Sequence, residues 1–261
     1  MQRSRSRDPP GRGSRIADAA SPRAAPRSPA SCAGILAAAG SGDRAAGGAG
    51  LPKQFREVAG RPLFQWSLAA LLDAGCTPVI VAVPEALLER APSLAASDDR
   101  VRFVAGGPHR QASVAAALEA VTTDVVVVHD AARPLASADL VRKVVAALDA
   151  SQVVGAIPAV PVDETVKSVC PDAVGDVTVI DATVDRDRLL LAQTPQAFRV
   201  EPLREAHRRA AAKGFLATDD AQLIERYLGA GVAIVDGERR NVKVTHPEDM
   251  ALVGWLMGAG R

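Results

Sequence analysis

Apolar residues along the chain form short continuous runs, and the stretches between these runs have helical spacing. Val79–Val83 and Val125–Val128 lack polar alternation, which is typical of strands buried on both faces. Phe64, Leu68 and Leu71 recur at the spacing of one helix face. The alternation predicts an α/β fold: a mostly parallel central sheet with helices on both faces, Rossmann-like in type. Further strands are expected at 34–37, 101–104, 153–157 and 232–235, and further helices at 114–121, 140–148, 202–213, 219–228 and from Pro247 onward.

The segment at about 161–187 breaks this rhythm. Two β-like runs, 165–169 and 177–180, flank a turn region with proline and glycine, so we expect an inserted β-hairpin arm. Isolated two-stranded hairpins are marginally stable in water. The arm is therefore expected to pack on something.

Composition limits the class of protein. With 261 residues, 48% apolar and 23% charged, the chain has an ordinary globular balance and fits one large domain, residues 31–261. The net charge of +1 excludes a broad basic surface for nucleic acid, so an anionic ligand needs local cations. No apolar run approaches the length of a membrane span, and no membrane partner is expected. Three cysteines without a Cys-x-x-Cys pair predict reduced thiols in a cytoplasmic protein.

Residues 1–30 form a separate block, in which seven arginines lie among serine, proline and glycine. Too few apolar residues are present to offset the entropy of ordering the segment. Organellar transit peptides share this composition, and a start codon placed too early is another explanation. The many prolines argue against an amphipathic transit helix, so we predict a disordered tail.

The first strand leads into a glycine-rich loop, Leu36 to Arg44 (LAAAGSGDR), and Pro52-Lys53-Gln54 follows. Small residues let the backbone approach a phosphate, and its N–H groups can bind anionic oxygens. Arg44 and Lys53 add the positive charge that a triphosphate requires. The loop lacks the third glycine of a dinucleotide fingerprint and the Gly-Lys-Ser/Thr of a P-loop, which leaves the signature of sugar-nucleotide pyrophosphorylases and their relatives. The predicted phosphate-binding positions are Ala38, Ala39, Gly40 and Gly42.

Two further segments end predicted strands. In Gly106 to Val114 (GGPHRQASV), we expect Gly106, Arg110 and Ser113 to contact the nucleotide base or ribose. In His129 to Pro134 (HDAARP), Asp130 lies at the carboxyl end of a central strand, where open α/β sheets bind ligands. An acid beside a triphosphate commonly serves a magnesium ion, so Asp130 is the predicted Mg²⁺ ligand. The alternative is an Asp130–Arg133 pair that closes the loop, and His129 is expected to pack beneath the site.

Through these three segments, the chain resembles the 2-C-methyl-D-erythritol 4-phosphate cytidylyltransferase family of non-mevalonate isoprenoid synthesis. The resemblance covers roughly residues 33–255. Two departures are a slightly longer Gly/Ala segment between Arg44 and Lys53, and Ala45 where a larger residue is common. The other motifs that carry the resemblance are DETVK at 163–167, TVDR at 183–186, QTPQ at 193–196, TDD at 218–220 and NVKVT at 241–245.

The resemblance implies that CTP and the polyol phosphate give 4-diphosphocytidyl-2-C-methyl-D-erythritol and pyrophosphate, with Mg²⁺ as the cofactor. It implies that Arg44 and Lys53 stabilise charge on the phosphates, whereas Arg186 and Lys243 hold the substrate phosphate. Arg133, Thr165 and Thr194 are implied to assist. In the family the arm reaches into a second subunit, so a homodimer is expected in which Thr165 and Arg186 serve the neighbour's site. Otherwise Arg186 is a solvated arm residue and Lys243 a strand-end charge.

Two alternatives stay open. One is a ribitol-5-phosphate cytidylyltransferase, which would share the nucleotide half and differ in the polyol pocket. The other is a catalytically silent nucleotide-binding or regulatory module, against which the joint presence of five charged site residues argues. A bifunctional chain that also carries the later cyclase is not expected, because the sequence given ends at Arg261, just after the last expected helix.

Overall fold

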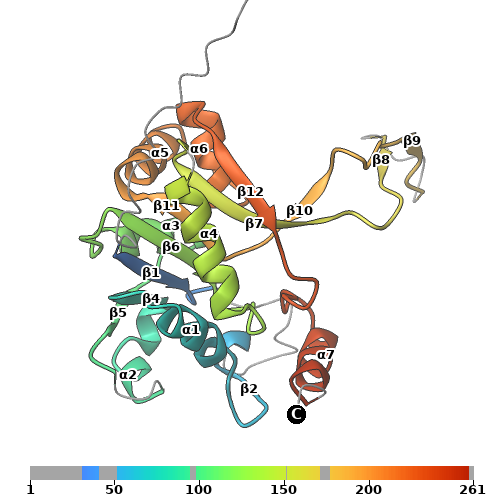
Figure 1. Ribbon diagram of the computed structural model, residues 1–261. Coiled ribbons are helices and arrows are strands. Elements are labelled where there is room, and N and C mark those ends of the chain that lie inside the picture. The colour runs from blue at the N-terminus through green and yellow to red at the C-terminus, as the bar shows by residue number, and fades with distance from the viewer. Residues whose placement is uncertain (1–30, 41–51, 95–97, 151, 171–176, 259–261) are drawn as a thin grey trace, which may run out of the picture.

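The computed structural model describes residues 31–40, 52–94, 98–150, 152–170 and 177–258 (Figure 1). The predicted tail, and the loop positions Gly42 and Arg44, lie outside the described residues. Within the described ranges, every helix is too short or too polar to cross a membrane.

A single large sheet forms the centre of the described chain. Its strand order is β10-β7-β11-β6-β1-β4-β5, and β12 pairs with β7. The pairs β6-β1, β1-β4, β4-β5 and β7-β12 are parallel, whereas β10 and β11 run antiparallel to their neighbours. The prediction of a mostly parallel sheet is confirmed. The strands are β1 (Cys32–Ala37), β4 (Val79–Val83), β5 (Val101–Ala105), β6 (Val125–Asp130), β7 (Gly155–Pro161), β10 (Leu190–Ala192), β11 (Gln196–Arg199) and β12 (Val232–Asp236).

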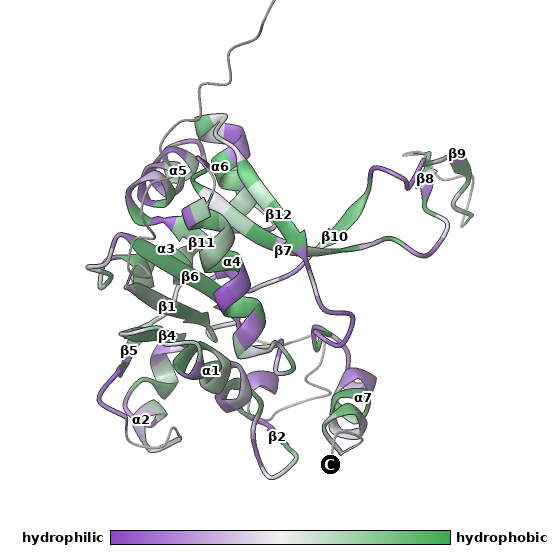
Figure 2. Ribbon diagram, in the orientation of Figure 1, coloured by the Kyte–Doolittle hydropathy of each residue, from purple (hydrophilic) through white to green (hydrophobic). Residues whose placement is uncertain are grey.

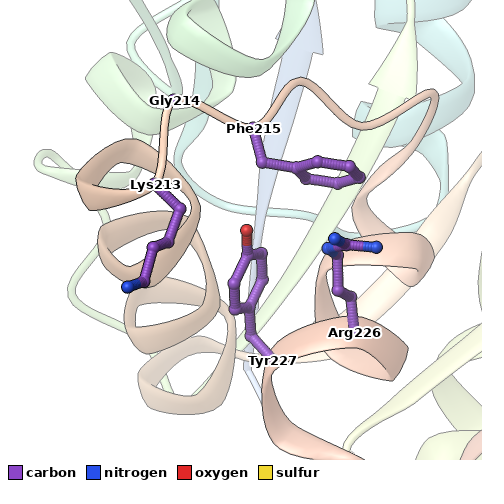
Figure 3. Close-up of a pocket in the computed structure, with 5 residues that line it drawn as sticks. All are labelled: Lys213, Gly214, Phe215, Arg226 and Tyr227. Atoms are coloured by element: carbon purple, nitrogen blue, oxygen red, sulfur yellow. The ribbon is translucent and has the colours of Figure 1, made fainter.

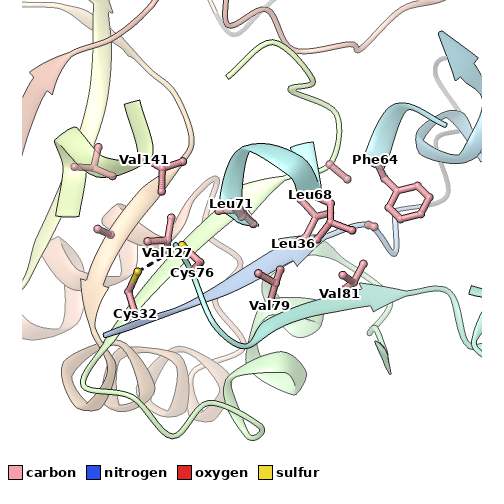
Figure 4. Close-up of a cluster of buried hydrophobic side chains, with 14 of the residues drawn as sticks. Cys32, Leu36, Phe64, Leu68, Leu71, Cys76, Val79, Val81, Val127 and Val141 are labelled. Atoms are coloured by element: carbon pink, nitrogen blue, oxygen red, sulfur yellow. Dashed lines mark hydrogen bonds between the residues drawn. The ribbon is translucent and has the colours of Figure 1, made fainter. Parts of the chain in front are cut away.

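Helices cover both faces of the sheet, as expected. Helices α1 (Leu63–Asp73) and α4 (Ala138–Ala150) pack on one face, where Leu36 and Val127 contribute to the core (Figure 4). The other face carries Ile35 and Val126, which pack against α3 (Arg110–Leu118), α5 (Val200–Ala212) and α6 (Asp220–Leu228). Successive strand residues point to opposite faces of the sheet. Because helices shield both faces from water, both sets of residues are apolar, which explains the unbroken apolar runs of the sequence. Figure 2 shows the same strands as hydrophobic bands between more polar helices.

Several elements were not predicted. Strand β11 has the sequence QAFR, which contains no apolar run, yet it lies between β6 and β7. Strand β7 begins two residues later than expected and extends to Pro161. The other unpredicted elements are β10, η2 (Lys53–Phe55), η3 (Glu85–Leu87), α2 (Ala91–Leu94) and the hairpin of β2 (Glu57–Val58) with β3 (Arg61–Pro62). The last helix, α7 (Pro247–Gly258), begins where it was expected.

The inserted hairpin is present and projects away from the body of the molecule (Figure 1). Strand β8 (Lys167–Val169) pairs antiparallel with β9 (Ile180–Thr183). The second strand lies three residues later than the apolar run suggested, because Lys167 pairs with Thr183 and a register irregularity follows Ser168. Three apolar side chains of the arm, those of Val169, Val177 and Ile180, are more than half exposed.

Candidate active site

The predicted loops meet at one edge of the sheet. Ala37, the last residue of β1, lies opposite Asp130, the last residue of β6, so the segment from Ala38 begins beside Asp130. Gly106 follows β5 at the same edge, and a Cβ atom at Gly106 would lie 2.2 Å from the Cβ of Ala39. Only glycine permits this approach, which brings the first and second predicted segments together.

The Pro-Lys-Gln segment ties the loop to the C-terminal part of the chain. Gln54 is buried, and its Nε2 donates to the carbonyl oxygens of Ala38 at 2.6 Å and Gly40 at 2.8 Å. Lys53 Nζ donates to the carbonyl oxygen of Val244 at 2.7 Å, beside Lys243. The structure thus ties Lys53 to the residue that follows Lys243, and it gives Gln54 a part in shaping the loop that the sequence analysis had not assigned.

Asp130 is the centre of the site. Arg110 Nε donates to its Oδ1 at 2.7 Å, and Lys243 Nζ lies 2.8 Å from its Oδ2. Burial alone would raise the pKa of Asp130, but the charges of Arg110 and Lys243 outweigh burial and hold it below the ordinary value. Asp130 is therefore an ionised carboxylate. The alternative ion pair with Arg133 is not the one formed, since the Arg133 guanidinium donates to the carbonyl oxygen of Asn241 at 2.8 Å.

A buried hydrogen-bond chain fixes Asp130 from below. His129 is fully buried, and burial lowers its pKa to about 4, so the ring is neutral. Its Nε2 donates to the Arg133 carbonyl oxygen at 3.3 Å, which leaves Nδ1 to accept from the Thr194 hydroxyl at 2.9 Å. Thr194 Oγ1 accepts in turn from the Asp130 backbone N–H at 3.1 Å, and Asn241 Nδ2 donates to the Thr194 carbonyl oxygen at 2.8 Å. The Thr194 hydroxyl is thus engaged within the protein.

Two predicted nucleotide contacts also have partners inside the protein. Ser113 is buried, accepts from the Gly107 N–H at 3.2 Å and lies 3.1 Å from the carbonyl oxygen of His109. Arg110 is shared between Asp130 and a second buried acid, Asp220, at 2.7 Å from each. Asp220 belongs to the TDD motif, but no periodicity or strand-end rule singles it out as part of the site.

The arm residues lie apart from this cluster in the same chain. Thr165 and Arg186 are both exposed, on the two segments that connect the arm to the sheet. The Arg186 guanidinium donates to the carbonyl oxygen of Asp163, and the Asp163 carboxylate pairs with Arg239. The structure therefore brings Lys53, Arg110, Asp130, Arg133, Thr194 and Lys243 together, and leaves Thr165 and Arg186 on the arm.

The described residues could bind a magnesium ion only together with the phosphates of a bound nucleotide. Among the described residues, no group of three His, Cys, Asp or Glu side chains could enclose a metal. Mg²⁺ commonly binds through one or two carboxylates together with substrate phosphates and water. Asp130 Oδ2, whose ion-pair partner Lys243 is 44% exposed, fits that kind of binding.

A separate hollow lies on the α5–α6 side of the molecule. This open depression of about 590 Å³ is lined by Lys213, Gly214, Phe215, Arg226 and Tyr227 (Figure 3). Arg226 lies 4.3 Å from the Phe215 ring centroid, and Phe215 meets Tyr227 edge to face. None of the predicted site residues lines it.

Small-residue segments, two lysines and one ionised carboxylate at the carboxyl edge of a parallel sheet are the arrangement expected of an enzyme that binds nucleotide phosphates, such as a nucleotidyltransferase. Comparison with known proteins gives the family. The model of the 2-C-methyl-D-erythritol 4-phosphate cytidylyltransferase family matches residues 32–259. The chain belongs to this family of isoprenoid-synthesis enzymes.

Individual relatives agree. The chain is 42% identical to the Aquifex aeolicus 2-C-methyl-D-erythritol 4-phosphate cytidylyltransferase, covering 86% of this chain and 96% of that one. It is 43% identical to the bifunctional enzyme IspD/IspF of Sphingopyxis alaskensis, covering 88% of this chain but 56% of the longer relative. The crystal structure of the Thermus thermophilus cytidylyltransferase superposes with a TM-score of 0.69 at 38% identity, covering 87% of this chain and 98% of that one.

Proposed function

We propose that the enzyme joins CTP to 2-C-methyl-D-erythritol 4-phosphate and forms 4-diphosphocytidyl-2-C-methyl-D-erythritol and pyrophosphate. An oxygen of the polyol phosphate attacks the α-phosphorus of CTP, and a new P–O bond forms. The bond from the α-phosphorus to the oxygen bridging to the β-phosphorus breaks, and pyrophosphate leaves with that oxygen. The observation that carries the proposal is the convergence of Lys53, Lys243 and Asp130 on one sheet edge.

We assign the nucleotide to the glycine-rich loop. Phosphoryl-type transfer needs little covalent chemistry from protein groups, because positioning and charge stabilisation lower the barrier. Lys53, and Arg44 in the loop outside the described residues, would stabilise charge on the α-phosphate and on the leaving pyrophosphate. Gln54 supports this assignment, because it holds the carbonyl groups of Ala38 and Gly40 in place.

We assign the polyol phosphate to Lys243 together with Arg186, Arg133 and Thr165. Lys243 is a partly exposed cation held at the site by Asp130. Thr194 would act from beneath, through His129 and the Asp130 backbone. Asp130 would hold Mg²⁺ together with the nucleotide phosphates. When bound, that ion neutralises charge on the transferring group.

We further propose a homodimer in which the arm of one subunit completes the site of the other. The exposed Val169, Ile180, Leu190 and Leu191 support this, since a projecting hairpin with apolar side chains in water is marginally stable. Leu190 and Leu191 belong to β10, which is coloured as a hydrophobic strand in Figure 2. We also propose a cytoplasmic location, with which the free thiols of Cys32 and Cys76, 3.5 Å apart, agree.

Pyrophosphate release tests the reaction. The assay uses four nucleoside triphosphates, each with 2-C-methyl-D-erythritol 4-phosphate or ribitol 5-phosphate, in the presence of magnesium. Release is expected to be fastest with CTP and the methylerythritol substrate. Faster release with ribitol 5-phosphate would reassign the substrate, and no release with any combination would indicate a silent module.

Sedimentation at assay concentrations tests the shared site. A dimer is expected wherever the enzyme is active. A monomer with full activity at nanomolar concentration would contradict the proposal that the arms serve neighbouring sites.

A further inference from the structure

Arg110 connects the site to a buried carboxylate that the proposed reaction does not use. Its Nε donates to Asp130 and its Nη1 to Asp220 Oδ2, both at 2.7 Å. The Asp220 side chain is 1% exposed, and its other oxygen lies 2.9 Å from His207 Nε2. Three helices meet here, because Arg110 begins α3, Asp220 begins α6 and His207 lies in α5.

Asp220 is not needed to cap its helix. Asp219 is the N-cap of α6, and its Oδ1 accepts from the Gln222 N–H at 3.0 Å. Burial alone would raise the pKa of Asp220, but Arg110 and the hydrogen bond from His207 outweigh burial and hold the pKa below its ordinary value. Burying an ionised carboxylate costs free energy. Because Asp220 does not cap its helix, its charge must have another role.

We propose that Asp220 is a positioning residue for nucleotidyl transfer: it shares the charge of Arg110, so that Asp130 keeps its negative charge at Oδ2, the oxygen that faces Lys243. The inference deepens the proposed function and rests on it. His207 holds the far oxygen of Asp220. Arg110 Nη2 is buried without a hydrogen-bond partner in the described chain, so the two carboxylates set the orientation of the guanidinium.

A count of charges gives the expected direction. Asp130 and Asp220 balance Arg110 and Lys243, which leaves this group of four neutral. Without the charge of Asp220, the group carries one net positive charge, and Arg110 acts on Asp130 alone. Interactions between charges a few ångströms apart are strong in a partly buried site. Asp130 would then attract both Lys243 and a divalent cation less strongly.

The test is Asp220→Asn in the full-length enzyme, which keeps the size of the side chain and removes its charge. The dissociation constant of Mn²⁺ is measured by electron paramagnetic resonance with α,β-methylene-CTP bound, alongside kcat and the KM for CTP. We expect the Mn²⁺ dissociation constant to rise about tenfold and kcat to fall about tenfold, with the KM for CTP within about threefold of wild type.

Asp149→Asn is the matched control, because it removes an aspartate from another arginine pair, Arg199–Asp149 at 3.1 Å, and should change none of these constants. His207→Gln is the second variant and decides the matter if Asp220→Asn does not fold; we expect a two- to threefold shift in the same direction (about 0.5 kcal/mol). Wild-type Mn²⁺ affinity and kcat in the folded variant, even with a lower Tm, would overturn the proposal. A wild-type enzyme that releases no pyrophosphate would instead count against the proposed function itself.

Discussion

The cluster around Asp130 and the β8–β9 arm supply the two halves of the expected site, and they are built in opposite ways. The cluster is buried and hydrogen-bonded through His129, Thr194 and Asn241, so its geometry exists before any ligand arrives. The arm is exposed, and Arg186 is held there by a single backbone carbonyl, that of Asp163.

The difference separates two tasks. A preorganised cluster can stabilise charge at the α-phosphate without rearranging during the reaction. An exposed arm gains its apolar contacts and its position only when it packs on another surface. Nucleotide chemistry should therefore depend on single-chain residues, and binding of the polyol phosphate should depend on assembly.

The largest expected effect is at Lys53. Lys53→Ala should lower turnover about a hundredfold to a thousandfold, because a preorganised cation at the phosphates is lost. Folding should be retained, since the Lys53 side chain is only partly buried and is not part of the hydrophobic core. Steady-state kinetics and thermal melts measure both, and Lys143→Ala, an exposed lysine on α4, is the control. Near-normal turnover in Lys53→Ala would show that Lys53 does not stabilise charge during the reaction.

His129 offers the second test, on stability. Its pKa is about 4 in the folded protein and about 6.5 in an unfolded chain, so the folded state binds fewer protons between these values. The free energy of unfolding is therefore highest above pH 6.5 as far as His129 is concerned. It falls by up to about 3 kcal/mol as the pH decreases to 4. Asp130 and Asp220 have lowered pKa values in the folded protein. Their contribution to stability is therefore lost only as the pH falls below about 3.8, the pKa of an aspartate in the unfolded chain.

Urea unfolding at several pH values compares wild type with His129→Asn. The variant should lose less stability than wild type between pH 6.5 and 4. Equal losses in the two proteins would mean that the neutral ring beneath Asp130 does not contribute in this window.

The arm gives the third test. Arg186→Ala should lower turnover about a hundredfold while leaving Tm unchanged, because the side chain is exposed and acts by positioning. An equal mixture of Arg186→Ala and Lys53→Ala should show about a quarter of wild-type activity. Half of the dimers then contain one chain of each kind, and each of these dimers has one intact site. No recovery on mixing would place Arg186 in the site of its own chain. Lys143→Ala mixed with Lys53→Ala should give about half of wild-type activity, because half of the sites keep Lys53 and every arm is intact.

The sequence predicts the parallel half of the sheet better than the antiparallel half. Strands β4 and β6 are apolar on both faces and leave a clear signal, whereas β11 is recognised as a strand only by its partners β6 and β7. The same holds for the site. Asp130 follows from its place at a strand end, but Gln54, His207 and Asp220 act through buried contacts between distant segments, which no local spacing encodes.

The position of β11 has a consequence for how the enzyme is made. At roughly 5–20 residues per second of synthesis, β6 leaves the ribosome several seconds before β11, which lies against it. During that interval the β6 edge has unpaired backbone groups, a surface on which other chains can pair. The contacts of Lys53 and Asp130 with residues 243–244 form later still. A nascent chain therefore has no complete nucleotide site, and its β6 edge stays without the β11 partner until residues 196–199 arrive.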